Sequence, residues 1–364
     1  MKIRIKKDRI RDAAKIAASA ADKRGAIPIL ANILLEAEDN LLRLTATNLE
    51  IGVSTVVDCI VEEEGKATVN ASKAVRLFSS LTGEELTLER EEGKVVVKSV
   101  NSRFSLASLP PEEFPEVEVP EDFSVKLPSD EIDKALKKVS YAAGKDEAKY
   151  ILTGVLLRSF GDRFHAVATD GHRLALYEVF VESEEWSAII PKKSLSELKR
   201  LLREGNEVEI VEKHNKIYFR SGDTVMWSSL IEGEYPDYTK VIPEGNSKVF
   251  TVDRGEFLSA LKEVSVIFDR EEVRAVIFDL TENSLRLTAK SLEGETSEEA
   301  EVVIPVEYSG EPFRIGFNIA HMIESIGSFD GDSITVHMEE PVSPVLVTSQ
   351  EEPQLKNVIM PMKV

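Results

Sequence analysis

Asp170, His172 and Arg173 stand in one short turn, within the stretch "VATDGHRLAL" at 167–176. A histidine beside a carboxylate can act as a general base, with the aspartate orienting the imidazole. The sequence supplies nothing further for such a mechanism, because it contains no G-x-S-x-G, H-E-x-x-H, P-loop or dinucleotide-binding motif. The five histidines show no metal-ligand spacing: 165, 172, 214, 321 and 337. We therefore expect no catalytic residue, no metal and no cofactor.

The carboxyl-terminal stretch "NVIMPMKV" at 357–364 is a second feature with a possible chemical role, in this case binding. Val358, Met360 and Met362 alternate around Pro361. Methionine adapts to different apolar partners, and an exposed apolar patch on a protein surface usually marks an interaction site. The tail therefore favours a surface that accepts apolar segments of partner proteins.

The composition is that of a soluble globular protein. Of 364 residues, 42% are hydrophobic and 30% charged, and no run approaches the 18 apolar residues of a membrane helix. The basic start "MKIRIKKDRIRDAAK" lacks the apolar core of a secretory signal, so we expect a cytoplasmic protein. The single cysteine, Cys59, excludes an internal disulfide framework and is expected to be a small packed residue. The length favours two or three domains.

Three stretches of the chain repeat one another: "LRLTATNLE" at 42–50, "FHAVATDGH" at 164–172 and "LRLTAKSLE" at 285–293. Each follows a predicted strand and an amphipathic helix, whose apolar stripe opens at Ile10, Ile132 and Phe257 respectively. A second strand and helix and further alternating strands come next, so each unit holds two β-α-β-β-β halves. The sequence therefore predicts an α+β protein of three tandem domains, each with two helices packed on antiparallel sheets: 1–121, 122–244 and 245–364.

Proline-rich acidic segments separate the predicted domains, "LPPEEFPEVEVPED" at 109–122 and "GEYPDYTKVIPEGNSK" at 233–248. Both contain an aromatic residue, a proline and an acid in succession, which indicates that the linker is repeated with the domain. Within the domains, Asp8 and Ser129 are predicted helix N-caps. Turns are predicted at Glu92-Gly93, Asp170-Gly171 and Asp330-Gly331.

The charge is unevenly distributed along the chain. A formal charge of -20, from 65 acidic and 45 basic residues, argues against nucleic-acid binding if it is evenly spread. The six predicted helices hold 12 basic and 7 acidic residues, against 33 and 58 elsewhere: 9–20, 72–81, 131–143, 194–203, 256–268 and 319–327. The basic residues of any one helix could simply form a solvated face, and the last two helices are not basic.

Four agreeing helices nevertheless favour a common basic side that attracts phosphates, within a surface that otherwise repels them. The basic residues that avoid the apolar stripes are Arg11, Lys15, Lys73, Arg76, Lys134, Lys137, Lys138, Lys199, Arg200 and Arg203. The sequence shows no recognition helix and no aromatic platform for stacking bases, so contact with a nucleic-acid backbone, without sequence readout, is the mode that remains.

Together these features resemble a known family. Three tandem two-helix units, "ATDGHRLAL" in the second, "EYPDYTKVIP" at the next boundary and the terminal "VIMPMKV" are similar to the bacterial DNA polymerase III β subunit, the sliding clamp. The resemblance covers the whole chain. It implies a ring-forming head-to-tail homodimer around duplex DNA, with helices lining the hole, that acts as a DNA polymerase processivity factor. The implied partners are the replicative DNA polymerase, the clamp loader and repair or translesion polymerases.

The resemblance also implies where partners bind. The terminal tail would lie beside the turn of the second domain and form a pocket for segments of the Gln-Leu-x-Leu-Phe type. Matching position by position, the lining would be Leu152, Thr169, Gly171, His172, Arg173, Leu174, Pro243, Val342, Pro344, Val358, Met360, Pro361 and Met362, edged by Asn318 and His321. Family members often carry tyrosine where His321 stands. Arg24 matches a position that faces DNA, and the subunit contact would join Arg103 and Phe104 to Ile267 and Phe268.

A size estimate supports the dimer independently. A domain of 120 residues has a radius of gyration of roughly 14 Å and is about 35 Å across. Three such spheres enclose a hole of about 5 Å, whereas six enclose about 35 Å, wider than a duplex of about 20 Å. Only a ring of six domains, made by two chains, admits DNA.

The three repeats provide an internal control for the turn. Where the second has Thr169-Asp170-Gly171-His172-Arg173, the first has Thr47-Asn48-Leu49-Glu50-Ile51 and the third Lys290-Ser291-Leu292-Glu293-Gly294. His172 and Arg173 are thus dispensable for the fold, which favours a function confined to the second domain. A rival hypothesis is an acidic three-repeat scaffold that binds proteins and does not encircle DNA.

Overall fold

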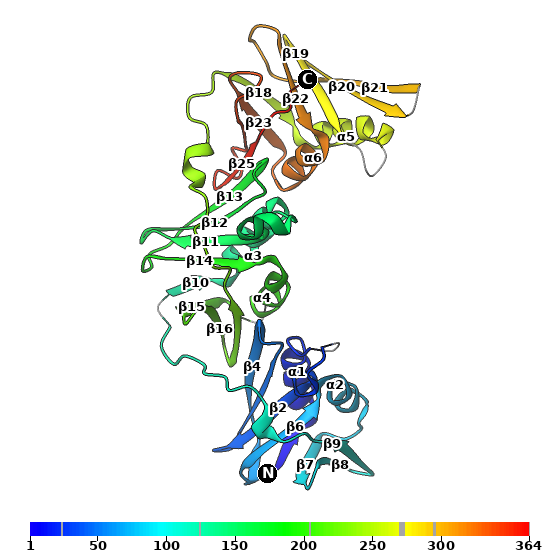
Figure 1. Cartoon of the computed structure of the whole chain (residues 1–364), viewed down its shortest axis with the longest axis vertical. Coiled ribbons are helices and arrows are strands. Elements are labelled where there is room, and N and C mark those ends of the chain that lie inside the picture. Colours follow the sequence, from blue (N-terminus) through cyan, green and yellow to red (C-terminus); the bar gives the residue numbers. More distant parts are fainter. Residues whose placement is uncertain (23–24, 124, 204, 269–273, 294–295, 364) are drawn as a thin grey trace. The chain divides into compact units, whose positions relative to one another are not determined.

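The computed structural model of the chain describes residues 1–22, 25–123, 125–203, 205–268, 274–293 and 296–363 (Figure 1). The chain folds into two compact units, residues 1–132 with 193–230, and residues 133–192 with 231–364. Among these residues the pattern of strand, helix and three strands occurs six times, as the sequence predicts.

The first two repeats of this pattern belong to the first unit, where α1 and α2 lie side by side (Figure 1). The elements are β1 (Lys2–Lys6), α1 (Lys7–Ala17), β2 (Asn32–Glu38), β3 (Leu41–Thr47), β4 (Ile51–Asp58), an added short β5 (Ile60–Glu63), β6 (Gly65–Asn70), α2 (Ala71–Ser80), β7 (Glu85–Glu91), β8 (Lys94–Ser99) and β9 (Ser102–Ala107).

The middle of the chain contributes to both units. Its elements are β10 (Val125–Pro128), α3 (Ser129–Val139), β11 (Gly154–Ser159), β12 (Arg163–Thr169), β13 (Arg173–Phe180), β14 (Trp186–Pro191), α4 (Leu195–Leu201), β15 (Glu207–Lys213), β16 (Lys216–Ser221) and β17 (Thr224–Ser229).

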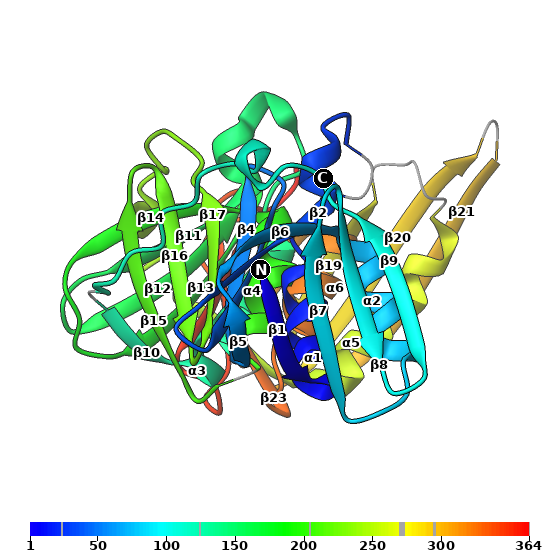
Figure 2. The same ribbon diagram turned by 90° about the horizontal axis from the view of Figure 1, so that it is seen from below.

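The last third lies in the second unit, where α5 and α6 are in contact and β20 and β21 form a long hairpin against α5 (Figure 2). Its elements are β18 (Lys248–Asp253), α5 (Arg254–Val264), β19 (Ala275–Thr281), β20 (Ser284–Glu293), β21 (Thr296–Pro305), β22 (Phe313–Asn318), α6 (Ile319–Gly327), β23 (Ser333–Met338), β24 (Val345–Thr348) and β25 (Leu355–Ile359). Short 3-10 turns are η1 (Pro28–Ala31), η2 (Pro111–Glu113), η3 (Ser140–Ala142), η4 (Glu147–Thr153), η5 (Lys192–Ser194), η6 (Tyr238–Val241) and η7 (Ser265–Ile267).

Antiparallel sheets join strands from neighbouring repeats. The first unit contains the sheets β5-β1-β7-β8-β9 and β10-β15-β16-β17-β4-β3-β2-β6, and the second contains β14-β11-β12-β13-β25-β24-β23-β18 and β21-β20-β19-β22. Because β4 pairs with β17, and β13 with β25, a compact unit need not coincide with a sequence repeat. The domain boundaries at 121 and 244 therefore stay a prediction about the repeats.

Each helix buries the apolar stripe that its sequence indicates. In α1 the buried positions are Ile10, Ala13, Ala14 and Ala17, and in α5 they are Phe257, Ala260, Leu261 and Val264. This spacing of three and four residues is that of one helix face. The predicted ranges differ from the observed ones by at most four residues at either end, because η3 and η7 continue α3 and α5 as 3-10 turns.

Three local predictions were wrong: two helix caps and one turn. Asp8 lies in the first turn of α1, whose N-cap position is Lys6, and Ser129 is itself the first residue of α3. The carboxylate of Asp8 still faces the positive end of the helix dipole. Asp330-Gly331 connects α6 to β23 and is not a hairpin turn, whereas Glu92-Gly93 and Asp170-Gly171 do join paired strands.

Candidate functional site

An apolar groove of about 140 Å³ lies in the second unit, beside the β12–β13 turn. Three segments that are distant in the sequence form its walls: the turn with η4, the linker after β17, and the carboxyl-terminal strand. The lining residues are Leu152, Thr169, Gly171, Arg173, Leu174, Pro236, Asp237, Tyr238, Val241, Val358 and Met360.

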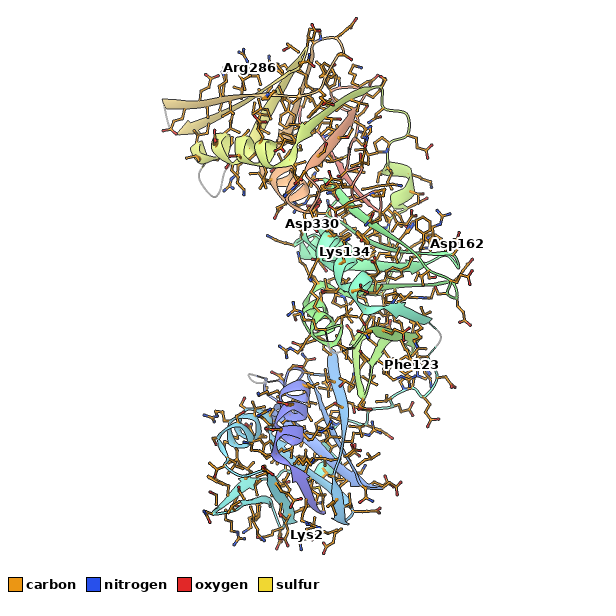
Figure 3. All side chains as sticks on the ribbon, turned by 180° about the vertical axis from the view of Figure 1, so that it is seen from behind. Lys2, Phe123, Lys134, Asp162, Arg286 and Asp330 are labelled. Carbon is orange, nitrogen blue, oxygen red and sulfur yellow. The ribbon has the colours of Figure 1, made fainter. Side chains whose placement is uncertain are left out.

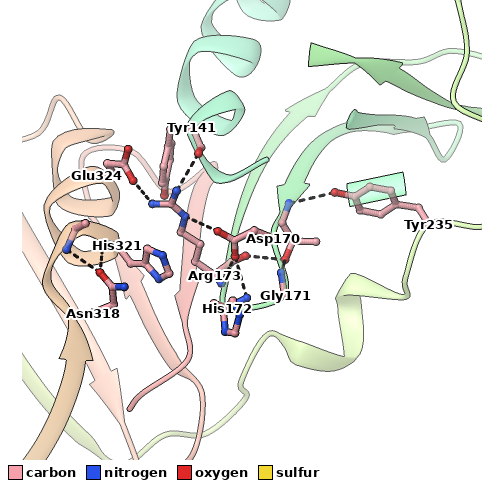
Figure 4. Close-up of polar contacts among 11 residues, drawn as sticks. Tyr141, Asp170, Gly171, His172, Arg173, Tyr235, Asn318, His321 and Glu324 are labelled. Carbon is pink, nitrogen blue, oxygen red and sulfur yellow. Dashed lines mark hydrogen bonds and ion pairs between the residues drawn. The ribbon is translucent and has the colours of Figure 1, made fainter. Parts of the chain in front are cut away.

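The turn is held by its own side chains (Figure 4). Oδ1 of Asp170 accepts hydrogen bonds from the backbone N–H groups of His172 and Arg173, at 2.9 and 3.0 Å. The hydroxyl of Thr169 donates to the carbonyl of Arg173 at 2.6 Å and accepts from the N–H of Gly171 at 3.1 Å. Gly171 has φ 89°, in the left-handed region that favours glycine. The turn therefore presents a fixed backbone to the groove.

Arg173 is buried, and its guanidinium points towards Tyr141 and Glu324 (Figure 4). Nε lies 3.1 Å from Oδ2 of Asp170, Nη2 donates to the carbonyl of Tyr141 at 3.1 Å, and Nη1 pairs with Glu324. The guanidinium also stacks over the Tyr141 ring, 5.2 Å from its centroid. Arg173 thus fastens the turn to α6 and to η3. Asp170 uses its carboxylate for this fastening, which leaves the general-base hypothesis for His172 without support.

The carboxyl-terminal stretch is a paired strand and not a free tail. β25 lies between β13 and β24, with Leu174 opposite Val358, and the N–H of Met360 donates to the carbonyl of His172 at 2.8 Å. Val358 is 2% exposed and Met360 is 38% exposed, so the expected exposed patch reduces to Met360. The N–H of Met362 bonds to the carbonyl of Gly316 at 2.8 Å. The structure thus places the turn and the chain end side by side.

The sequence analysis treated 233–248 as a domain boundary and placed only Pro243 of this linker in the pocket, so it missed the linker residues that line the groove. Pro236, Asp237, Tyr238 and Val241 line the groove. The repeated aromatic-proline-acid element marked the segment, but its placement over the sheet depends on tertiary packing.

The other predicted pocket residues lie outside the groove lining. The rings of His172 and His321 face each other with centroids 6.3 Å apart, and Asn318 caps α6 by accepting from the N–H groups of Ala320 and His321. Burial lowers the pKa of His321, and the nearby Arg173 lowers it further. The rest are half-buried or, for Val342, exposed: Pro243, Val342, Pro344, Pro361 and Met362.

Lys138 was predicted to face DNA together with the other basic helix residues, but the structure buries it. It is 5% exposed, and its ammonium lies 2.7 Å from Oε1 of Glu352 and 2.8 Å from Oδ2 of Asp330. Figure 3 shows Lys134 of α3 next to Asp330, which marks the place where α3 meets the α6–β23 connection. A lysine that is buried and paired with two carboxylates is unavailable to phosphates.

The remaining basic residues are at least partly accessible, and several have acidic neighbours on their own helix. Lys73, Arg76 and Arg203 are exposed, whereas Lys134 and Lys199 are half-buried. Ion pairs join Arg11 to Asp8 and Asp12, Lys15 to Asp12, Lys137 to Asp133 and Arg200 to Glu197. Surface pairs of this kind are worth little and exchange readily, so they lower the positive field of a helix face without removing it. Arg24 lies outside the described residues.

The residues predicted for a subunit contact differ in exposure. Phe104, on β9, is 43% exposed, and Arg103 beside it pairs with Glu91 at 3.0 Å. Phe268 is buried within its own chain and Ile267 is half-buried. Val266 is 81% exposed, and sequence reasoning had not singled it out.

Within the described ranges, no cluster of three or more His, Cys, Asp or Glu side chains could hold a metal ion. Among the same residues, no helix is long and apolar enough to span a membrane.

Comparison with known proteins places the chain in one family along its length. Family profiles match residues 1–118, 126–237 and 239–363, as the N-terminal, central and C-terminal domains of the DNA polymerase III beta subunit. A beta sliding clamp of Pseudomonas aeruginosa is 32% identical over 356 residues, covering 96% of each chain.

Solved structures agree. The DNA polymerase III subunit beta of Pseudomonas aeruginosa superposes with a TM-score of 0.92 at 30% identity, covering all of both chains. A beta sliding clamp of Caulobacter crescentus, with PEG bound to its putative beta-motif tethering region, gives 0.90 at 29% identity, over 100% of this chain and 99% of that one. The fold is thus that of a three-domain clamp with antiparallel sheets. The chain belongs to the DNA polymerase III beta subunit family, the bacterial sliding clamps.

Proposed function

We propose that the chain is a DNA polymerase processivity factor, a ring-shaped sliding clamp that encircles duplex DNA without sequence specificity. Its groove would tether polymerases and other replication or repair proteins by their peptide segments. The observation that carries this proposal is the apolar groove formed by the turn, the linker and β25, in a chain that matches the clamp family from end to end. The scaffold alternative is not favoured, because it does not account for that match.

We propose a homodimer whose subunits meet at sheet edges. β9 and β21 each end their sheet among the described strands, and an edge strand offers unpaired N–H and C=O groups to a further strand. Two chains joined head to tail use one heterologous contact twice and so close a ring. Phe104 on β9 and Val266 after α5 are large apolar side chains exposed near these positions, and Arg103, Ile267 and Phe268 complete the proposed contact.

A ring that encloses DNA would need only weak contacts with it. A ring that surrounds a duplex holds it by topology, so the basic residues need only weak contacts with the phosphates, which permit sliding. Exposed Lys73, Arg76 and Arg203 suit this role, with the paired Arg11, Lys15, Lys137 and Arg200 able to exchange partners. We assign no catalytic step to the chain and propose that it acts in the cytoplasm.

The groove suits apolar peptide side chains. Leu152, Leu174, Val241, Val358 and Met360 offer the surface that the Leu and Phe of a Gln-Leu-x-Leu-Phe segment would bury. Partners of this type would be the replicative polymerase, the clamp loader and repair or translesion polymerases. Met360, which is flexible and partly exposed, suits a site that accepts several sequences.

The test is retention on DNA after loading. We expect the protein to stay on a nicked circle and to escape from linear DNA of the same length, because only free ends release a closed ring. Equal retention on both would contradict encirclement. Sedimentation at micromolar concentration provides a second check, since a stable monomer cannot form the ring.

A further inference from the structure

A chain of hydrogen bonds connects strands β12 and β13 to the linker wall of the groove. Nε2 of His165 lies 2.7 Å from Oε2 of Glu178, and Nδ1 of His165 lies 2.8 Å from the hydroxyl of Tyr238. His165 and Glu178 are directly opposite each other in the β12–β13 register, so their contact is built into the sheet. An ionised carboxylate only accepts, which places the imidazole proton on Nε2 and leaves Nδ1 to accept the O–H of Tyr238.

The surroundings favour the neutral imidazole that this arrangement needs. His165 is 8% exposed, and the Phe160 ring packs edge-on against it at 4.8 Å. Burial lowers the pKa of His165, Glu178 opposes that shift, and Arg163 and Lys356 add to it. A neutral imidazole can accept a hydrogen bond at Nδ1, whereas an imidazolium cannot.

Two tyrosines fix the linker that walls the groove. The hydroxyl of Tyr235 accepts from the N–H of Thr169 at 3.1 Å, in the turn itself. Three residues later, Tyr238 is 3% exposed and bonds to His165. The lining residues Pro236 and Tyr238 belong to this fastened stretch, so the two hydroxyl contacts set the position of the wall.

The repeats provide an internal comparison. Counting from the matched alanines, the position of His165 is occupied by Arg43 in the first repeat and by Arg286 in the third. Tyr238 corresponds to Val117 in the first linker, which packs against an apolar cluster. A linker can therefore be held without a hydroxyl–imidazole contact, and the contact is present in the repeat that supplies the turn of the groove.

We propose that His165 is a positioning residue for partner binding: held by Glu178, it fixes Tyr238 and with it the linker wall against which a partner peptide packs. This inference rests on the proposed function of the groove. Without the contact, the wall occupies its binding position for a smaller fraction of the time, and apparent affinity falls by that fraction. The loss of one such buried hydrogen bond is expected to weaken peptide binding about three- to tenfold.

The test uses the full-length protein and a fluorescein-labelled peptide containing Gln-Leu-Ser-Leu-Phe, with binding read by anisotropy at pH 7.5. H165L and Y238F are each expected to weaken binding three- to tenfold, and the double variant to lose less than the product of the two. H165N, whose amide oxygen can stand in for Nδ1, is expected to bind more tightly than H165L. The matched control is H337L, which removes a part-buried histidine that bonds to Thr348 on β24 and does not line the groove.

Thermal unfolding of every variant separates positioning from general destabilisation. H165L and H337L are expected to lower the melting temperature similarly, while only H165L weakens the peptide. Affinities of H165L and H337L within twofold of each other, or independent effects of H165L and Y238F, would overturn the inference while leaving the groove function intact. A wild-type protein that does not bind the peptide would overturn the groove function and this inference with it.

Discussion

Replacing Lys138 by methionine should cost far more stability than replacing its helix neighbour Lys137. Lys138 and Glu352 are each 5% exposed and 2.7 Å apart, whereas the second partner, Asp330, is largely exposed. The variant K138M therefore leaves Glu352 as a buried charge without its cation. Breaking a buried ion pair from one side costs about 3–5 kcal/mol. K137M removes an exposed lysine paired with Asp133, and should cost no more than about 1 kcal/mol.

The assay is urea unfolding of K138M, K137M and the double variant K138M/E352Q at pH 7.5. The double variant should regain a large part of the loss, because it removes the stranded charge together with the cation. Burial raises the pKa of Glu352, but the hydrogen bond from Lys138 and those from the N–H groups of Asp330 and Gly331 lower it more, so the net pKa lies below the ordinary 4.5. The contribution of ionised Glu352 to the free energy of unfolding is present above pH 4.5 and is lost as the pH falls through its lower folded pKa. In K138M that acid-dependent loss should be reduced.

Two results would refute this reasoning. Equal stabilities of K138M and K137M would mean that the buried pair contributes nothing measurable. The second result concerns the slope of the logarithm of DNA affinity against the logarithm of salt concentration. If K138M made this slope smaller by about one, Lys138 would be a phosphate contact, as the sequence pattern predicts.

Three further outcomes follow from single sites. Because Gly171 has φ 89°, G171A should lower the free energy of unfolding by about 1–2 kcal/mol, and a thermal melt indistinguishable from wild type would count against the strained turn. Burial, with a smaller effect of Asp58, raises the pKa of the Cys59 thiol to about 11. A thiol reagent at pH 8 should therefore react on the order of a hundredfold more slowly with the folded protein than with the urea-unfolded one, and equal rates would contradict this. Burial lowers the pKa of His165 below its ordinary 6.5, so its contribution to stability should be lost as the pH falls from 6.5 towards the folded pKa, and H165L should show a flatter pH profile than wild type between pH 7.5 and 5.5.

Most of the helices and strands could be predicted from the sequence. Apolar residues three and four apart marked the helices, as at Ile10 and Ala13 of α1, and repeated stretches around Ala46, Ala168 and Ala289 fixed the order of the halves. These features are local, because they depend on which face of an element is apolar and on turn residues a few positions away. The short β5 and the exact helix ends were not anticipated, since they depend on neighbouring strands and 3-10 turns.

Only part of the candidate site could be predicted from the sequence. A turn with Gly171 and Arg173 in one repeat, and an apolar stretch at 357–364, could be recognised as unusual without knowledge of the fold. The direction of the Arg173 guanidinium, towards Glu324 and the Tyr141 carbonyl, depends on residues 151 and 32 positions away. The linker wall with Tyr238 likewise exists only where the chain folds back over the sheet.

The sequence by itself determined three repeats of two β-α-β-β-β halves, a distinctive turn and an apolar end, because periodicity and composition act within one element. Tertiary structure decided which faces meet. Lys138 shows the difference: periodicity placed it beside the apolar stripe of α3, and only the approach of Glu352 made that position a buried ion pair. Charge on a helix is a property of the sequence, whereas its availability to a ligand depends on what packs against it.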